Sequence, residues 1–205
     1  MELFDMGALV TTPDIGGLPC LQKLKLMRCE SLEEIHQSLG NHSSLVQVHV
    51  TKCKKLRRFP PIVKMDRLET LEIEECGALV EFPKIEAKMD RLIKLSLTRA
   101  GIEVLPSSVG RYCTNLISLE LSYCMSLKSI EGNFHALKCL EKFAIILVTQ
   151  LDNLQQLMLT GCLRKLYLSS CNLKDGGIPN EVGELTGLQE LDLSENDFTR
   201  LLQVT

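Results

Sequence analysis

The stretch LETLEIEECGAL, Leu68–Leu79, alternates apolar and polar side chains and then ends in small residues. Leucine or isoleucine occupies positions 1, 4 and 6 of this phrase, and polar residues stand beside positions 4 and 6. Because successive side chains of a strand point to opposite faces, the pattern predicts a short β-strand with one apolar face. Cys76 at position 9 follows the strand, where we expect the chain to turn inward.

The same phrase, L-x-x-L-x-L-x-x-C or a variant of it, recurs along the whole chain. Its copies begin 23 to 25 residues apart, at Leu21, Leu45, Leu68, Leu92, Leu116, Leu140, Leu163 and Leu188. The copy at Leu140 is the weakest match. The stretch from Met6 to Thr12 resembles the end of a further, truncated unit. A fixed period of this length indicates stacked repeats.

The phrase is that of a leucine-rich repeat. It predicts an α/β solenoid, a horseshoe with a parallel sheet on the concave side and short helices or loops on the convex side. One unit cannot bury its apolar face alone, so the units must stack. We therefore expect residues 1–205 to form a single leucine-rich-repeat domain of about eight units plus the truncated N-terminal one.

One segment, LQQLMLTGCLRKLYLSSC at Leu154–Cys171, contains the phrase twice in succession. The residues between the two copies are too few for the crossover of about a dozen residues that parallel neighbours need. The 23-residue interval from Leu140 selects Leu163–Leu168 as the strand. We expect Leu154–Leu159 to lie on the convex side as a short helix, with Leu157 nearer the surface of the coil.

The cysteines follow the repeat. Position 9 is Asn196 in the last unit, and in five other units it is a cysteine: Cys29, Cys53, Cys76, Cys124 and Cys171. Cysteine is small, is often buried and is a weak hydrogen-bond donor, which suits an inward turn. We expect a ladder of buried, reduced thiols. Disulfides or a metal site are the alternative, although no histidine stands at ligand spacing.

Composition argues against several classes of function. The formal net charge of −3 offers no basic stripe for nucleic acid. No apolar window of about 18 residues is present to span a membrane. The four histidines fall in separate units or loops, and no serine–histidine–aspartate or cysteine–histidine pair has supporting context. We therefore expect no catalytic residues, no cofactor and no metal.

Several stretches make the resemblance more specific than the repeat alone. They are TTPDIGGLPCL at Thr11–Leu21, CESLEEIHQSLGNHSSL at Cys29–Leu45, CKKLRRFP at Cys53–Pro60, LPSSVG at Leu105–Gly110 and LSSCNLKDGGIPNEVGELTGLQELDLSENDF at Leu168–Phe198. Together they resemble the leucine-rich-repeat region of plant intracellular nucleotide-binding disease-resistance proteins of the Toll/interleukin-receptor-type class. The chain has no phosphate-binding G-x-x-x-x-G-K-[ST] motif, so we expect a fragment or a truncated product.

The resemblance implies a non-catalytic protein-recognition module of a plant innate-immune receptor, in the cytoplasm or the nucleus. Its partner would be a pathogen effector or a guarded host protein. If the chain is part of a longer protein, the receptor's own nucleotide-binding domain is a further partner. The alternative is an extracellular leucine-rich-repeat receptor ectodomain, because IPNEVGELTGLQELDLSENDF at Ile178–Phe198 resembles the plant extracellular repeat. That similarity is confined to one unit.

Side chains at positions 3, 5, 7 and 8 are expected to line the concave surface and to contact a protein partner. The candidates are Lys23, Lys25, Arg28, His49, Glu72, Glu74, Lys94, Arg99, Glu120, Tyr123, Tyr167, Glu190 and Asp192. The rows alternate in charge, which suits selective recognition of a complementary surface. Ala144, Ile146 and Leu147 form an apolar row between Tyr123 and Tyr167, a candidate hot spot. The alternative is that these rows are ordinary solvated strands.

Overall fold

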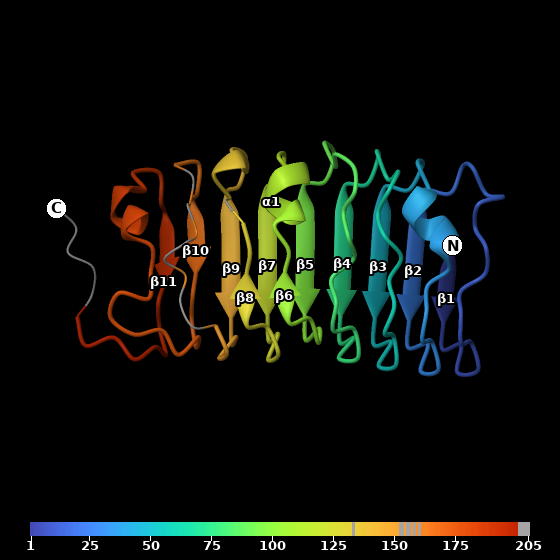
Figure 1. Cartoon of the computed structure of the whole chain (residues 1–205), viewed down its shortest axis with the longest axis horizontal. Coiled ribbons are helices and arrows are strands. Elements are labelled where there is room, and N and C mark those ends of the chain that lie inside the picture. The colour runs from blue at the N-terminus through green and yellow to red at the C-terminus, as the bar shows by residue number, and fades with distance from the viewer. Residues whose placement is uncertain (133, 152–153, 155–156, 158, 160, 201–205) are drawn as a thin grey trace.

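A parallel sheet forms one side of the molecule along its whole length (Figure 1). The computed structural model describes residues 1–132, 134–151, 154, 157, 159 and 161–200. Within them the strand order of the sheet is β1-β2-β3-β4-β5-β7-β9-β10-β11. The bounds are β1 Glu2–Phe4, β2 Lys23–Met27, β3 Gln47–Thr51, β4 Thr70–Glu74, β5 Lys94–Thr98, β7 Ser118–Ser122, β9 Lys142–Ile146, β10 Lys165–Tyr167 and β11 Glu190–Asp192. The predicted solenoid is confirmed.

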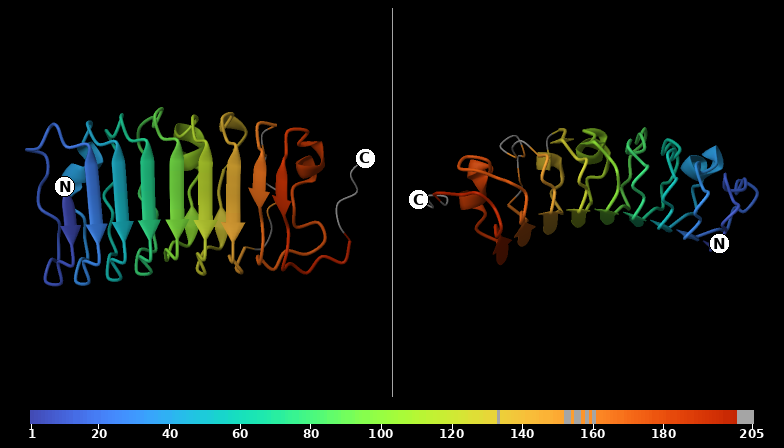
Figure 2. Two further views of the ribbon diagram at one scale, coloured as in Figure 1. Left: turned by 180° about the vertical axis from the view of Figure 1, so that it is seen from behind. Right: turned by 90° about the horizontal axis from the view of Figure 1, so that it is seen from below.

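Neighbouring strands pair so that equal phrase positions lie side by side. Leu71 of β4 pairs with Leu95 of β5, for example, and Leu95 pairs with Leu119 of β7. Positions 4 and 6 thus form two apolar columns that face the interior, because every second residue of a strand points to the same face. Figure 2 shows the gently curved solenoid from its edge, with the strands along the concave side.

Short helices and extended segments form the convex side, as the repeat pattern predicted. Among the described residues the helices are η1 Gln37–Asn41, α1 Ser108–Tyr112, η2 Phe134–Ala136 and η3 Asn180–Glu184; α1 is α-helical and the other three are 3₁₀. Two short strands, β6 Val104–Leu105 and β8 Ser129–Ile130, pair with each other in front of the main sheet in Figure 1. Isolated bridges such as Glu81↔Val104 connect other convex segments.

The strand chosen between the two successive phrases is confirmed. β10 lies inside Leu163–Leu168 and pairs with β9 through Leu166↔Phe143. The predicted helix over Leu154–Leu159 falls mostly outside the described residues. Leu157 is described and is 3% exposed, so the expectation that it lies nearer the surface was wrong. Its side chain belongs to the same apolar core as Leu166, because the convex segment also packs inward.

The truncated first unit begins earlier than the sequence indicated. β1 pairs with β2 through Glu2↔Lys25 and Leu3↔Leu26, so the unit contributes a strand as well as the predicted stretch from Met6 to Thr12. The sequence did not reveal this strand because too few residues of the phrase precede it.

The position-9 cysteines form the predicted buried ladder. All five are 0% exposed, and each thiol donates to a backbone carbonyl of its own unit. The thiols of Cys29, Cys76, Cys124 and Cys171 also donate to a carbonyl of the preceding unit. The Cys171 Sγ, for instance, lies 3.3 Å from both the Ile145 and the Ser169 carbonyl oxygens. Asn196, which replaces the cysteine in the last unit, also accepts hydrogen bonds from backbone N–H groups. Its amide oxygen accepts from the Cys171 and Leu173 N–H groups at 3.0 and 3.1 Å.

Thiol titration of the native chain should separate the cysteines into two groups. Burial raises the pKa of the Cys113 thiol to about 12 and that of the Cys124 thiol to about 11, which leaves little reactive thiolate. With a colorimetric disulfide reagent at pH 8, we expect fast reaction only at the exposed Cys20, Cys139 and Cys162. The buried group should react only after unfolding, because the reagent does not reach side chains that are covered by the core: Cys29, Cys53, Cys76, Cys113, Cys124 and Cys171. Fast labelling of a ladder cysteine, found by peptide mapping, would contradict the packing.

Candidate protein-interaction surface

The outer face of the sheet presents polar side chains because the pleat buries the residues between them. In β4, Leu71 and Ile73 are each 1% exposed, whereas Thr70, Glu72 and Glu74 are partly exposed. Ten of the thirteen candidate residues lie in strands of this face: Lys23, Lys25, His49, Glu72, Glu74, Lys94, Glu120, Tyr167, Glu190 and Asp192. The other three, Arg28, Arg99 and Tyr123, come directly after β2, β5 and β7.

The charges of this face are paired with one another across neighbouring strands. Lys94 Nζ lies 2.5 Å from Glu72 Oε1, and Lys142 Nζ lies 2.7 Å from Glu120 Oε1. Both pairs join position 3 of one unit to position 5 of the unit before it. Further pairs are Lys25–Glu2 at 3.0 Å, Arg28–Asp5 at 3.2 Å, His49–Glu72 at 3.5 Å and Lys165–Glu190 at 2.6 Å. The acidic and basic side chains of neighbouring rows therefore neutralise each other within the surface.

The pKa shifts of Lys94 and Glu120 favour the charged forms of these two residues. The hydrogen bond from Lys94 to Glu72 raises the pKa of Lys94. Partial burial pushes the pKa of Glu120 upward, but the hydrogen bond and charge of Lys142 outweigh it, so that the pKa is lowered overall. Lys94 and Glu120 are therefore charged at neutral pH, and the ladder of ion pairs links neighbouring strands of the sheet.

Tyr167 and Glu190 extend this ladder of ion pairs at its C-terminal end. The Tyr167 hydroxyl donates to Glu190, which also accepts from Lys165. The hydrogen bond from Lys165 is the largest cause that lowers the pKa of Glu190, and the bond to Glu190 raises the pKa of Tyr167. The ring of Tyr167 lies 5.9 Å from Lys142 Nζ, so this tyrosine is already engaged by neighbours on both sides.

An apolar patch remains at the end of β7 and β9. It consists of Tyr123, Met125, Ile146 and Leu147, and we call it the Tyr123 patch. Tyr123 is 38% exposed and Met125 is 48% exposed, while Ile146 and Leu147 are partly exposed. The guanidinium of Arg99 lies 4.5 Å from the centre of the Tyr123 ring, a cation–π contact that holds the ring in place.

The structure corrects the predicted apolar row in one place and extends it in another. Ala144 is only 2% exposed, because this small residue lies between Glu120 and Tyr167 of the adjacent strands. Met125 was not among the predicted candidates, because it follows the turn at position 10, outside the alternating strand. An apolar residue directly after the turn was the only signal that the sequence offered.

Position 8 adopts a left-handed backbone conformation in unit after unit, which the sequence did not reveal. Arg28, Arg99 and Tyr123 have φ values of 55°, 50° and 58°. This conformation costs an L-residue about 1 kcal/mol or more. A hydrogen bond to the next unit offsets part of that cost: the Tyr123 N–H donates to the Ile146 carbonyl at 2.7 Å. The bend ends each strand at the same level, so that Arg99 and Tyr123 lie at the rim of the sheet.

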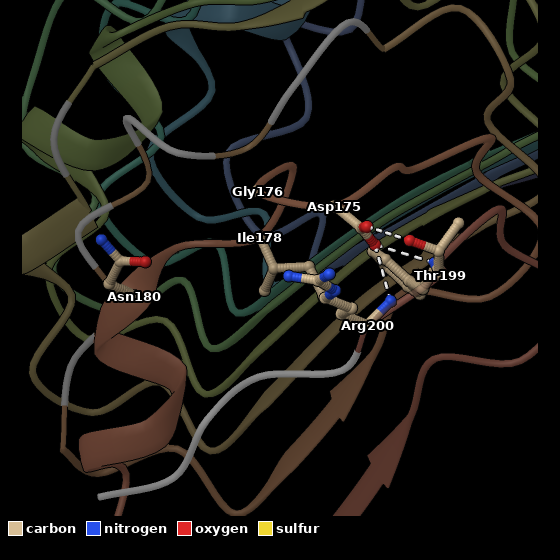
Figure 3. A pocket seen from close by; sticks show the side chains of 7 residues that line it. Asp175, Gly176, Ile178, Asn180, Thr199 and Arg200 are labelled. Atoms are coloured by element: carbon tan, nitrogen blue, oxygen red, sulfur yellow. Dashed lines mark hydrogen bonds between the residues drawn. The ribbon is translucent and has the colours of Figure 1, made fainter.

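A pocket of about 450 Å³ lies between the last two units (Figure 3). Asp175 lines this pocket, and its carboxylate accepts hydrogen bonds from the Thr199 N–H at 2.8 Å, the Arg200 N–H at 3.0 Å and the Thr199 hydroxyl. The hydroxyl bond is the largest cause that lowers the pKa of Asp175. Because this carboxylate is occupied in joining two units, we assign the pocket a structural role.

The described residues also bear on metals and membranes. Among residues 1–132, 134–151, 154, 157, 159 and 161–200, no group of three or more histidine, cysteine, aspartate or glutamate side chains is placed to hold a metal ion. In the same part of the chain, none of the helices has the length and apolar character needed to cross a membrane.

Comparisons with known proteins agree with the fold and the repeat pattern. The family model described as Leucine Rich Repeat matches residues 162–185. The leucine-rich-repeat domain of the type III effector XopL superposes with a TM-score of 0.76 at 26% identity, over 95% of this chain and 67% of that one.

Similar sequences come from plant disease-resistance proteins. TMV resistance protein N of Nicotiana glutinosa is 33% identical over 94% of this chain. Disease resistance protein RPP4 of Arabidopsis thaliana is 29% identical over 90% of it. The chain spans 21% and 18% of the lengths of these two relatives. With the nine-stranded parallel sheet that its described residues form and with its repeated phrase, the chain is a leucine-rich-repeat domain of the kind found in plant disease-resistance proteins.

Proposed function

We propose that this domain is a non-catalytic protein-recognition module in plant defence, and that it binds a pathogen effector or a guarded host protein on its concave face. The Tyr123 patch carries the proposal, because it combines an exposed tyrosine, a methionine and two aliphatic side chains at the rim of a rigid sheet. Aromatic and aliphatic groups of this kind supply most of the energy of protein interfaces. The names of the relatives, which are resistance proteins, support a role in defence.

The two parts of the concave face have different roles in this proposal. The Tyr123 patch supplies affinity, and Arg99 keeps the Tyr123 ring ordered before the partner arrives, which lowers the entropic cost of binding. The ladder of ion pairs surrounds the patch with alternating charges. Such a rim selects among partners through like-charge repulsion more than it adds affinity.

The free thiols support a reducing compartment for this protein. All nine cysteines are unpaired, including the exposed Cys20, Cys139 and Cys162. Disulfides persist mainly in secreted proteins, and exposed free thiols are more typical of the cytoplasm or the nucleus. The cellular location that we propose is therefore intracellular, with a soluble protein as the partner.

Photo-crosslinking in plant tissue tests the proposal. The crosslinking residue p-benzoylphenylalanine would replace Met125 in the Tyr123 patch, or Val63 on the convex side as a control; the two side chains are 48% and 41% exposed. In infected leaves, irradiation should link the Met125 variant to one or a few proteins, identified by mass spectrometry as a pathogen effector or its host target. Adding Tyr123→Ala should lower that yield about tenfold, as loss of a hot spot does.

Two outcomes would contradict the proposal. One is an identical set of crosslinked proteins from the Met125 and Val63 variants, because this would indicate nonspecific contact. The other is an unchanged yield with Tyr123→Ala, because the patch would then contribute nothing to recognition. Circular dichroism of each variant excludes misfolding as the reason for a lost crosslink.

A further inference from the structure

A second candidate binding site lies on the convex side of the solenoid, opposite the sheet. It is a cleft of about 610 Å³ between the convex segment 80–86 of one unit and the segment 103–108 of the next. β6 and the start of α1 belong to the second segment, and both lie in front of the main sheet in Figure 1. The cleft is therefore separate from the Tyr123 patch.

The cleft follows from a change in convex structure between two units. The two segments are joined by the bridge Glu81↔Val104. Beyond it, Ile85 stays extended and bridges back to Ile62 of the preceding unit, whereas the next unit turns into α1 at Ser108. An extended segment and a helical turn rise differently per residue, so they cannot remain in register. A gap opens where they part.

The walls of the cleft are apolar and accessible. Val80 and Val104 are 49% and 36% exposed, while Phe82 and Ile85 beneath them are 7% and 4% exposed. Pro106 also lines the cleft, and it has no N–H group to satisfy. The walls can therefore take up an aliphatic side chain without burying an unpaired group of their own.

The rim of the cleft is negatively charged. Glu81, Glu86 and Glu103 line it against a single Lys84. Glu103 is paired with Lys128 outside the cleft at 2.8 Å. Neither Glu81 nor Glu86 has an ion-pair partner among the described residues, in contrast to the paired carboxylates of the concave face. The surplus of carboxylates favours a cationic occupant.

One polar group in the lining is also unsatisfied. The Ser108 hydroxyl oxygen is withdrawn from solvent and has no hydrogen-bond partner in the described part of the chain. A buried polar group without a partner costs about 1–3 kcal/mol. Rotation of this hydroxyl about the Cα–Cβ bond would be needed to turn it toward the cleft, where an extended peptide offers backbone N–H and C=O groups and a purely apolar ligand does not.

We propose that this cleft binds an extended peptide segment of a protein partner, in which an aliphatic side chain is flanked by lysine or arginine. The aliphatic side chain would contact Val80 and Val104, and the flanking cations would pair with Glu81 and Glu86. The site goes beyond the proposed function, because it is a second binding surface on the other side of the solenoid and does not depend on the Tyr123 patch.

Fluorescence anisotropy with defined peptides tests the site on the whole chain. The probe is a fluorescein-labelled peptide of sequence GKKLIKG, with GEELIEG and GKKSNKG as controls for charge and for the apolar side chains. We expect saturable binding of GKKLIKG that is about tenfold tighter than that of either control. Val104→Lys would place a tethered ammonium in the cleft and should weaken binding about tenfold, as should Val80→Lys.

Matched variants separate this site from the rest of the surface. Val63→Lys adds the same charge at a convex valine that is 41% exposed and does not line the cleft, so it should change affinity less than twofold. Tyr123→Ala should have no effect, so the result is independent of the concave proposal. The inference is overturned if GKKLIKG fails to saturate, if GEELIEG binds equally well, or if Val63→Lys and Val104→Lys weaken binding alike.

Discussion

Leu166→Asp is expected to unfold the C-terminal units of the solenoid. Leu166 is 0% exposed in the middle of β10, where it pairs with Phe143 on one side and Leu191 on the other. An aspartate there would place an unpaired carboxylate between stacked apolar columns. We expect a loss of about 4 kcal/mol or more in the free energy of unfolding. Urea unfolding measures it, and hydrogen exchange should show lost protection in β10 and β11 while β3–β5 stay protected.

Arg164→Asp is the matched control for this experiment. Arg164 is exposed two residues earlier in the same unit, so the same new side chain should change stability by no more than about 0.5 kcal/mol. Equal effects of the two variants would refute the assigned strand and favour Leu154–Leu159 instead. Leu157→Asp is a weaker control, because Leu157 is 3% exposed and its substitution should also be costly.

The sequence was sufficient for the strands of the main sheet from β2 to β11, although not for β1, because each phrase position does one physical task. A 23-residue interval placed β10 correctly even where a second copy of the phrase competed, since three intervening residues cannot form a crossover. The ladder cysteines followed from the same register. The convex side was less predictable, because there a short helix such as α1 and an extended segment such as that around Ile85 both complete the crossover.

The candidate surface was predicted in its location but not in its chemistry. Glu72 and Lys94 stand in rows of opposite charge, and the register of the repeats already made them neighbours that could pair. The burial of Ala144 depends on the size of Glu120 and Tyr167 in the adjacent strands, which only a three-dimensional arrangement reveals. The acidic cleft forms where two convex segments diverge, and no sequence motif predicts this divergence.

The turns after the strands are packed closely enough that one added methyl group should matter. Gly101 stands at position 10, and its N–H donates to the Cys76 carbonyl of the preceding turn at 3.3 Å. A Cβ at Gly101 would lie 2.0 Å from the Gly77 carbonyl oxygen and 2.9 Å from its carbon. These are backbone atoms that cannot rotate away. The two turns would have to separate, and the bond between them would be lost.

Gly101→Ala should therefore lower the free energy of unfolding by about 3 kcal/mol, at the upper end of the usual cost of overpacking. Gly77→Ala is the matched control, because Gly77 holds the same phrase position one unit earlier and a Cβ there would have no neighbour within 4 Å. We expect this variant to be neutral or stabilised by about 0.5 kcal/mol, since alanine restricts the unfolded chain. Urea unfolding of both variants decides the matter. If Gly77→Ala is the more damaging, then close backbone approach does not explain the glycine at position 101.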